Sequence, residues 1–212
     1  MKIAVFGASG AIGSSIVREA ACRGHVVTAI SRRQIAPPDH GAVVARCGDA
    51  RDLAWVMEIA GGHDVIVTAT RPSGGREHEL VDVARVMLLA AQRSESRLLV
   101  VGGAATLKVP GTGGRIVLDD PNYLPPAARA IARACVAQHE VCMANDAADW
   151  TYLSPPAQLV TGRRTGAYRL STDELLVDAK GASRISIPDL AVAAVDEIET
   201  PRHRRQRFTV AY

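Results

Sequence analysis

The sequence predicts an α/β fold of the Rossmann type, in which a doubly wound parallel sheet carries helices on both faces. Apolar runs of strand length alternate with longer stretches of helical periodicity, which is typical of consecutive βαβ units. The runs are apolar throughout rather than alternating, as expected of strands that are covered on both faces. Gly7, Gly10 and Gly13 follow the first run, at the point where a strand would turn into a helix.

Six buried strands and four helices are expected in the first three quarters of the chain. Each strand is a short, mostly apolar run, and each helix has apolar residues three or four positions apart. Gly24 is expected to end the first helix. In chain order the expected strands are 3–6, 25–31, 42–47, 64–70, 97–103 and 150–156. The expected helices between them are 11–24, 50–62, 76–94 and 127–146.

From about residue 155 the pattern loosens into shorter elements. Strands are expected at 168–173, 184–187 and 208–212, with a helix at 188–199. The 212 residues are enough for one core. We therefore expect a single domain over residues 1–212. Its Rossmann core (1–154) carries a small C-terminal elaboration (155–212) on the substrate side.

The composition argues against several classes of protein. No window reaches the roughly 18 apolar residues of a membrane span, and the first segment lacks the features of a signal peptide, so a cytoplasmic protein is expected. A net charge of +3, with aromatic residues that do not interleave with basic ones, indicates no nucleic-acid partner. The basic run 202–207 is interpreted as a solvated loop. The cysteines lack CxxC spacing and predict neither a disulfide nor a metal site; they are Cys22, Cys47, Cys135 and Cys142.

Three glycines have separate uses at a turn from strand to helix. One permits a tight turn, one lets the backbone approach a ligand, and one lets the helix pack closely on the sheet. The first turn of the helix then offers N–H groups and the positive end of its dipole to an anion. The spacing of Gly7, Gly10 and Gly13, between a strand and a helix, therefore predicts a pyrophosphate site. The alternative is a plain turn that holds no ligand.

The end of the second strand distinguishes the two nicotinamide coenzymes. NAD-dependent proteins usually place a carboxylate there, whereas this chain has Ser31, Arg32 and Arg33. Guanidinium groups and a hydroxyl suit a 2′-phosphate, so NADP(H) is favoured over NAD(H). Exposed arginines without a ligand are the alternative. After the third strand, Asp49 is placed to bond the adenine amino group or to cap the next helix, a role open to Asp52 as well.

These motifs resemble the atypical branch of the short-chain dehydrogenase/reductase superfamily. The resemblance rests on "GASGAIG" (7–13), "GDARD" (48–52), "VGGAATL" (101–107) and "WTYLSPPAQL" (150–159), and it covers nearly the whole chain. The chain looks most like the NmrA-like and biliverdin-reductase-B-like flavin reductases that bind NAD(P)H. The resemblance implies that the coenzyme is held by Gly7, Ser9, Gly10, Ala11, Ile12, Arg32, Arg33, Gly48, Asp49, Ala50, Ala69, Thr70, Arg71, Gly102, Gly103, Pro155 and Pro156.

The chain departs from this superfamily at the residues that carry catalysis. The usual pair is Tyr-x-x-x-Lys, and no tyrosine here has a lysine four residues on, which argues against tyrosine-driven carbonyl chemistry. Ala105 and Ala157 stand where the flavin reductases have a serine and a histidine. His139 matches a histidine on their long helix and is a candidate general acid, with ordinary helix packing as the alternative. Tyr123, in the preceding loop, either stacks on a planar acceptor or only packs the loop.

Two functions are consistent with these residues. Hydride transfer depends on the placement of donor and acceptor more than on a side-chain catalyst. We therefore expect an NADP(H)-dependent oxidoreductase with a small-molecule, flavin- or quinone-like acceptor. The alternative is a non-catalytic NAD(P) sensor that regulates a partner, as NmrA-like proteins can. The sequence leaves monomer and homodimer open.

Overall fold

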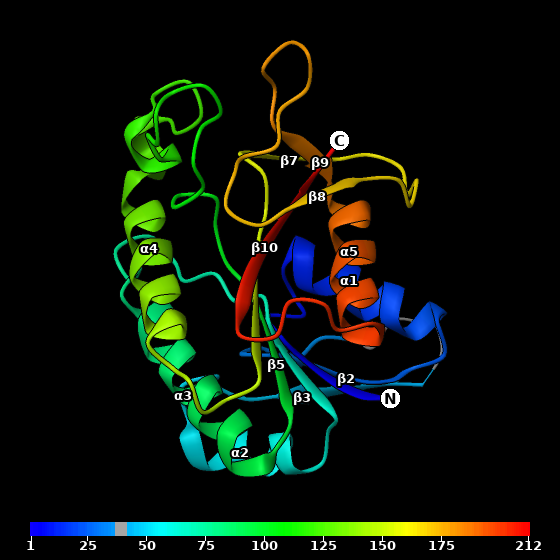
Figure 1. The fold of residues 1–212 in the computed structure, drawn as a ribbon. Helices are drawn as coiled ribbons and strands as arrows, with labels where there is room; N and C mark the ends of the chain where they lie inside the picture. Colours follow the sequence, from blue (N-terminus) through cyan, green and yellow to red (C-terminus); the bar gives the residue numbers. More distant parts are fainter. Residues whose placement is uncertain (37–41) are drawn as a thin grey trace.

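The computed structural model describes residues 1–36 and 42–212. Within these residues an eight-stranded sheet has the order β3-β2-β1-β4-β5-β6-β10-β8, and β7 pairs with β9 in a smaller sheet (Figure 1). The strands are β1 (Lys2–Phe6), β2 (Val26–Ser31), β3 (Val43–Cys47), β4 (Val65–Thr68), β5 (Arg97–Val101), β6 (Trp150–Ser154), β7 (Gln158–Val160), β8 (Arg169–Ser171), β9 (Arg184–Ser186) and β10 (Gln206–Ala211). The helices are α1 (Ala11–Cys22), α2 (Leu53–Gly61), α3 (Glu79–Ser94), α4 (Arg129–Met143) and α5 (Ile187–Glu199), with short 3₁₀ helices at Val117–Asp119 and Pro126–Ala128.

The strand order and direction confirm the predicted Rossmann-type fold. Every pairing in the main sheet is parallel except that of β10 with β8. The chain begins in the middle of the sheet with β1, runs outward through β2 and β3, and returns to β4 on the other side of β1. This reversal creates a switch point at the carboxyl ends of β1 and β4, where ligands bind in open α/β sheets.

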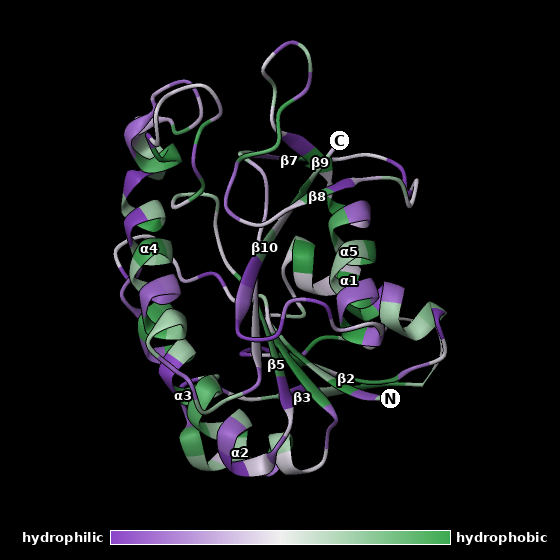
Figure 2. Cartoon of the chain, viewed as in Figure 1, coloured by the Kyte–Doolittle hydropathy of each residue, from purple (hydrophilic) through white to green (hydrophobic). Residues whose placement is uncertain are grey.

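Helices cover both faces of the main sheet (Figure 1). The pair α1 and α5 packs on one face, and α2, α3 and α4 form the layer on the other. Each layer encloses its own apolar cluster: Ile16 and Val195 belong to the first, and Met87 and Trp150 to the second. In Figure 2 the central strands are coloured mainly as hydrophobic, while the helices carry both kinds of residue. Covering on both faces explains why the strand runs are apolar throughout.

Much of the C-terminal segment belongs to the main layers. β10 pairs in parallel with β6, with Phe208 opposite Leu153, and α5 packs against α1. The Ser186 hydroxyl caps α5 by accepting the Asp189 N–H at 3.1 Å. The sequence predicts β8, β9, α5 and β10, but neither β7 nor the two 3₁₀ helices, which no pattern sets apart from the loops around them.

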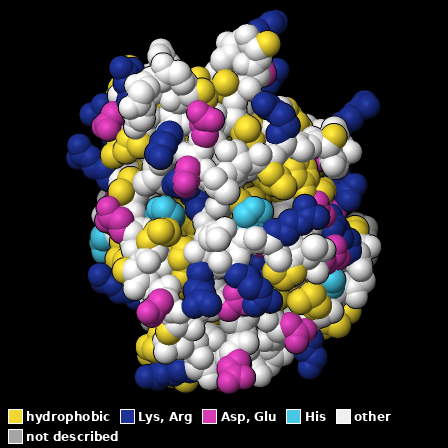
Figure 3. Space-filling model, in the orientation of Figure 1, with side chains coloured by type: hydrophobic (Ala, Val, Ile, Leu, Met, Phe, Trp, Pro, Cys, Tyr) yellow, Lys and Arg dark blue, Asp and Glu magenta, His cyan; other side chains and the backbone are white. Residues whose placement is uncertain are grey.

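The basic run 202–207 forms a solvated loop only in part. Arg204 Nη1 lies 2.5 Å from Asp149 Oδ2, and Arg207 is buried in β10, where it contacts Asp173. The expected loop therefore ends before the strand that Arg207 occupies. Figure 3 shows Lys and Arg side chains interspersed with Asp and Glu on the face in view. Among the described helices, none combines the length and the apolar character needed to cross a membrane.

Candidate functional site

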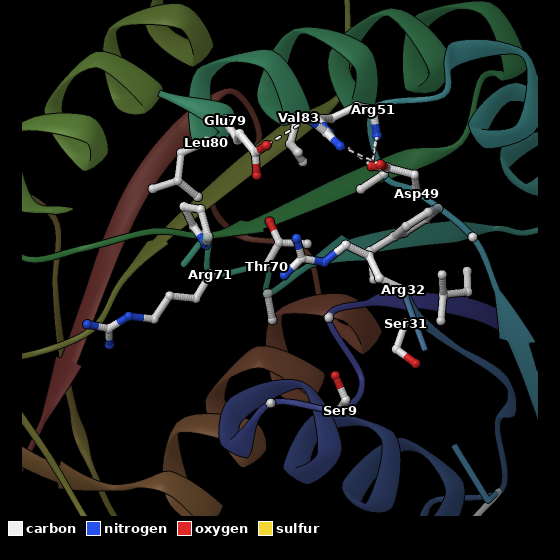
Figure 4. Close-up of a pocket in the computed structure, with 18 residues that line it drawn as sticks. Ser9, Ser31, Arg32, Asp49, Arg51, Thr70, Arg71, Glu79, Leu80 and Val83 are labelled. Atoms are coloured by element: carbon white, nitrogen blue, oxygen red, sulfur yellow. Dashed lines mark hydrogen bonds and ion pairs between the residues drawn. The ribbon is translucent and has the colours of Figure 1, made fainter. Parts of the chain in front are cut away.

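The carboxyl ends of β1, β2 and β4 open into a cavity of about 150 Å³, here called the glycine cleft (Figure 4). Its walls come from the turn after β1, the ends of β2 and β3, the loop after β4 and the first turn of α3. The residues that line it are Phe6, Gly7, Ser9, Gly10, Ile30, Ser31, Arg32, Gly48, Asp49, Ala50, Arg51, Ala69, Thr70, Arg71, Pro72, Glu79, Leu80 and Val83.

The turn after β1 needs glycine at two positions for steric reasons. Gly7 has a φ of +87°, and a Cβ there would lie 2.5 Å from the Ala69 carbonyl oxygen. A Cβ on Gly13 would lie 2.2 Å from the Gly7 carbonyl oxygen, so α1 packs against the turn only because this side chain is missing. Gly10 is the N-cap of α1 and supplies no side-chain cap. The first N–H groups of the helix are thus left for an anion in the cleft.

Two carboxylates of the glycine cleft are already paired with arginines. Arg51 Nη2 lies 2.6 Å from Asp49 Oδ2, and Arg51 Nη1 lies 2.7 Å from Glu79 Oε1 (Figure 4). Arg76 also contacts the buried Glu79. Hydrogen bonds from Arg51 hold the pKa of the Asp49 carboxyl below its ordinary value. Within the described residues Arg32 has no such carboxylate partner, so its charge is available to a ligand.

The loop after β3 shows which aspartate caps the next helix. Asp52 is the N-cap of α2 and accepts the Trp55 N–H at 3.2 Å. Asp49 instead faces the glycine cleft and binds Arg51. A Cβ on Gly48 would lie 2.3 Å from the Trp55 ring, so this glycine allows the indole to support the cleft from behind.

A second cavity, of about 410 Å³, lies beyond the carboxyl ends of β5 and β6, and we call it the apolar cavity. Loop residues before α4, the inner side of α4 and the segment after β6 enclose it. The side chains that line it are mainly aliphatic and include Leu124, Ile131 and Leu159. Thr70 and Arg71 line both cavities, so the two adjoin at the end of β4.

The floor of the apolar cavity packs on Tyr152, a fully buried residue of β6. A Cβ on Gly102 would lie 1.9 Å from the Tyr152 hydroxyl oxygen. The same oxygen accepts the Gly103 N–H at 3.3 Å. The glycine pair thus lets the chain leave β5 directly over the phenol, and burial raises the pKa of Tyr152 well above its ordinary value.

Most of the residues predicted from the sequence line one of the two cavities. In the glycine cleft are Gly7, Ser9, Gly10, Ser31, Arg32, Gly48, Asp49, Ala50, Ala69, Thr70 and Arg71. In the apolar cavity are Ile12, Gly102, Gly103, Tyr123, Pro155 and Pro156, together with the last three residues of the first group. Ala11, Arg33 and His139 belong to the described chain but line neither cavity.

The two candidate catalytic residues lie in different surroundings. Tyr123 is at the apolar cavity, and its hydroxyl donates to the Gly181 carbonyl at 3.0 Å. His139 packs edge-on against the Tyr152 ring at a centroid distance of 4.8 Å. Burial, helped by the positive charge of Arg207, lowers the pKa of His139 to about 4, so the imidazole is neutral at pH 7. Among the described residues its buried Nε2 atom has no hydrogen-bond partner.

The sequence interpretation missed three polar residues of these cavities. Arg51 lies within the "GDARD" motif, but nothing local shows that it pairs with Asp49 and Glu79. Glu79 begins α3 and has no distinguishing sequence signal. Gln138 directly precedes His139 on α4. Because successive helix residues point about 100° apart, Gln138 lines the apolar cavity and His139 does not.

Most of the chain matches one protein family. A model of NAD(P)H-binding proteins matches residues 7–198. The chain belongs to this NAD(P)H-binding family. The family confirms the resemblance to atypical short-chain dehydrogenases/reductases inferred from the motifs.

Three known proteins are similar to this chain over nearly their full length. The uncharacterized protein YwnB of Bacillus subtilis is 37% identical over 216 residues, which cover 99% of this chain and 98% of YwnB. A solved structure from Burkholderia pseudomallei, named as a candidate exported protein, is 39% identical to this chain. Its TM-score is 0.89, and the match covers 100% of both chains. A solved structure from Streptococcus pneumoniae, named as a candidate NADH-flavin reductase, is 28% identical to this chain. Its TM-score is 0.89, and the match covers 100% of this chain and 99% of the other.

The residues of the glycine cleft fit the coenzyme of the NAD(P)H-binding family. The cleft combines backbone that a Cβ would obstruct, a helix N-terminus without a side-chain cap, and an arginine without a carboxylate partner among the described residues. These are the features that bind the phosphates of a dinucleotide.

Proposed function

We propose that this protein is an NADP(H)-dependent oxidoreductase that transfers hydride to a flavin- or quinone-like small molecule. The observation that carries the proposal is the junction of the two cavities at Thr70 and Arg71. The chain offers an anion-binding cleft for a dinucleotide and, directly beside it, an apolar cavity large enough for a planar ring system.

Each part of the glycine cleft has a role toward the coenzyme. Gly7, Ser9 and Gly10 hold the pyrophosphate at the N-terminus of α1. Arg32 binds the 2′-phosphate, which favours NADP(H) over NAD(H). Asp49 is placed to bond the adenine amino group. Gly102 and Gly103 line the adjoining apolar cavity at the nicotinamide end, where the absence of side chains lets the backbone pass over Tyr152 and Cys135.

The chemistry requires little of the protein beyond placement. Bound reduced nicotinamide supplies two electrons as a hydride. The aliphatic walls of the apolar cavity hold the acceptor in contact distance of the nicotinamide. The described lining of this cavity contains no histidine or lysine, and its Tyr123 hydroxyl donates to the Gly181 carbonyl, so the acceptor takes its remaining proton from solvent.

Titration of the protein with NADPH and NADH, followed by oxidation assays with FMN and a naphthoquinone, tests this function. We expect tighter binding of NADPH than of NADH, and NADPH oxidation that depends on the acceptor. Tight binding without turnover on any acceptor would instead support a non-catalytic sensor. Equal binding of both coenzymes would contradict the role of Arg32 while leaving the oxidoreductase open to test.

A further inference from the structure

The apolar cavity contains one deep polar group that the proposed function does not use. Of the polar side chains that line it, the Tyr123 hydroxyl donates to Gly181 and the Thr70 hydroxyl lies 3.2 Å from that of Thr68. Arg71 is exposed and shared with the glycine cleft. Gln138, on α4, is only 1% exposed and still lines the cavity.

The hydrogen bonds of Gln138 leave its amide nitrogen for a ligand. Gln138 Oε1 accepts from the Tyr152 hydroxyl at 3.2 Å, and the same hydroxyl lies 3.2 Å from the Cys135 carbonyl oxygen, which shares its hydrogen. Tyr152 remains protonated, because burial raises its pKa well above the ordinary value, and can serve as this donor. Within residues 1–36 and 42–212 the two N–H groups of Gln138 Nε2 have no acceptor.

Gln138 lines the cavity, and its amide nitrogen is not sealed in the core. Four side-chain atoms of the described chain are fully buried without a partner, namely Arg97 Nε, His139 Nε2, Ser154 Oγ and Thr209 Oγ1. Gln138 Nε2 is unpartnered in the described chain but is not one of them, so it retains accessible surface. A donor held in apolar surroundings is costly to leave unpaired. It therefore selects a ligand that brings a hydrogen-bond acceptor.

We propose that Gln138 determines acceptor specificity by donating an N–H hydrogen bond to a carbonyl oxygen of an uncharged, apolar acceptor of the quinone class. This inference rests on the proposed function and narrows its acceptor. The body of the ring lies among the aliphatic side chains of Leu124, Ile131 and Leu159. The ribityl phosphate of FMN finds no cation in the described lining other than the exposed Arg71.

The reaction balances with the reactants already named. The quinone gains one hydride, that is two electrons and a proton, from the reduced coenzyme, and takes a second proton from water. Its two carbonyl groups become hydroxyl groups, and the coenzyme leaves in its oxidised form. Gln138 is a positioning residue for the oxygen it binds and exchanges no proton.

The test compares Gln138→Leu with the wild type and with Gln92→Leu. Gln92 lies exposed on α3 and away from both cavities, so its substitution is a matched control. Binding of 1,4-naphthoquinone is measured by calorimetry with and without saturating NADP⁺. We expect Gln138→Leu to weaken this binding about tenfold, to raise the KM for naphthoquinone while kcat changes little, and to leave NADPH affinity unchanged. Gln92→Leu is expected to change none of these.

A second comparison needs only the wild-type protein and holds even where Gln138→Leu fails to fold. Naphthalene has the same fused rings as naphthoquinone but no carbonyl group, and we expect it to bind clearly more weakly. Equal binding of the two would overturn the role of Gln138, and tighter binding of FMN than of naphthoquinone would overturn the acceptor class. Absence of NADPH binding would refute the coenzyme proposal alone, because calorimetry without coenzyme still reports on the apolar cavity.

Discussion

Replacement of Arg32 by alanine gives the sharpest test of coenzyme choice. Arg32 and Arg33 are consecutive, yet only Arg32 lines the glycine cleft. The negative charges of Asp49 and Glu79 are offset by Arg51 and Arg76. The guanidinium of Arg32 therefore supplies positive charge that a 2′-phosphate can use.

The size of the effect follows from the exposure of Arg32. A hydrogen bond to a charged group contributes about 1.5 to 3 kcal/mol. Because Arg32 is exposed, solvent screening places it at the lower end of this range. A loss of about 1.5 kcal/mol corresponds to about tenfold weaker binding of NADPH. NADH lacks the 2′-phosphate, so its affinity is expected to stay nearly constant.

Fluorescence titration of Arg32→Ala and Arg33→Ala with NADPH and NADH, at one fixed ionic strength, measures both effects. Arg33→Ala controls for the general loss of one positive charge, since Arg33 lies outside the cleft. The reasoning is refuted by an equal loss of NADPH and NADH affinity in Arg32→Ala. It is refuted equally by an Arg33→Ala variant that loses as much NADPH affinity as Arg32→Ala.

Three further predictions concern stability. Gly13→Ala is expected to lower the free energy of thermal or chemical unfolding by about 2 to 3 kcal/mol, because its Cβ meets the Gly7 carbonyl. A Cβ on Gly61 meets no atom within 4 Å, so the control Gly61→Ala is expected to change this free energy little. His139 has a pKa of about 4 in the folded chain, so the unfolded state binds the extra proton between pH 6.5 and 4 and stability falls as pH falls. Between pH 7 and 4.5, the unfolding free energy of His139→Phe is expected to fall by about 2 kcal/mol less than that of the wild type. Parallel curves of unfolding free energy against pH for the two proteins would contradict this. Glu197→Gln, which leaves buried Arg97 without its carboxylate, is expected to lower the unfolding free energy by about 3 kcal/mol in urea, and an unchanged midpoint would count against the pairing.

The order of strands and helices is readable from the sequence because burial on both faces leaves a continuous apolar run. Val65–Thr68 and Arg97–Val101 are examples, and both lie within the ranges predicted for them. Their predicted ends extend two residues too far, because the two residues that follow each strand are also small. β7 escapes prediction, although the equally short β8 and β9 do not, because it follows Pro155 and Pro156 closely and is not set apart from the surrounding loop.

By itself, the sequence determined the α/β class, the glycine turn and membership of a nicotinamide-binding family, because these depend on local spacing and on contacts within one βαβ unit. Only the tertiary structure decided which of Arg32 and Arg33 faces the cleft, since two adjacent residues differ there only in direction. It also decided that Arg51 is held by Glu79, which is 28 positions away. The cavity beside Gln138 likewise has walls from segments distant in the chain, whose meeting depends on how the helices pack on the sheet.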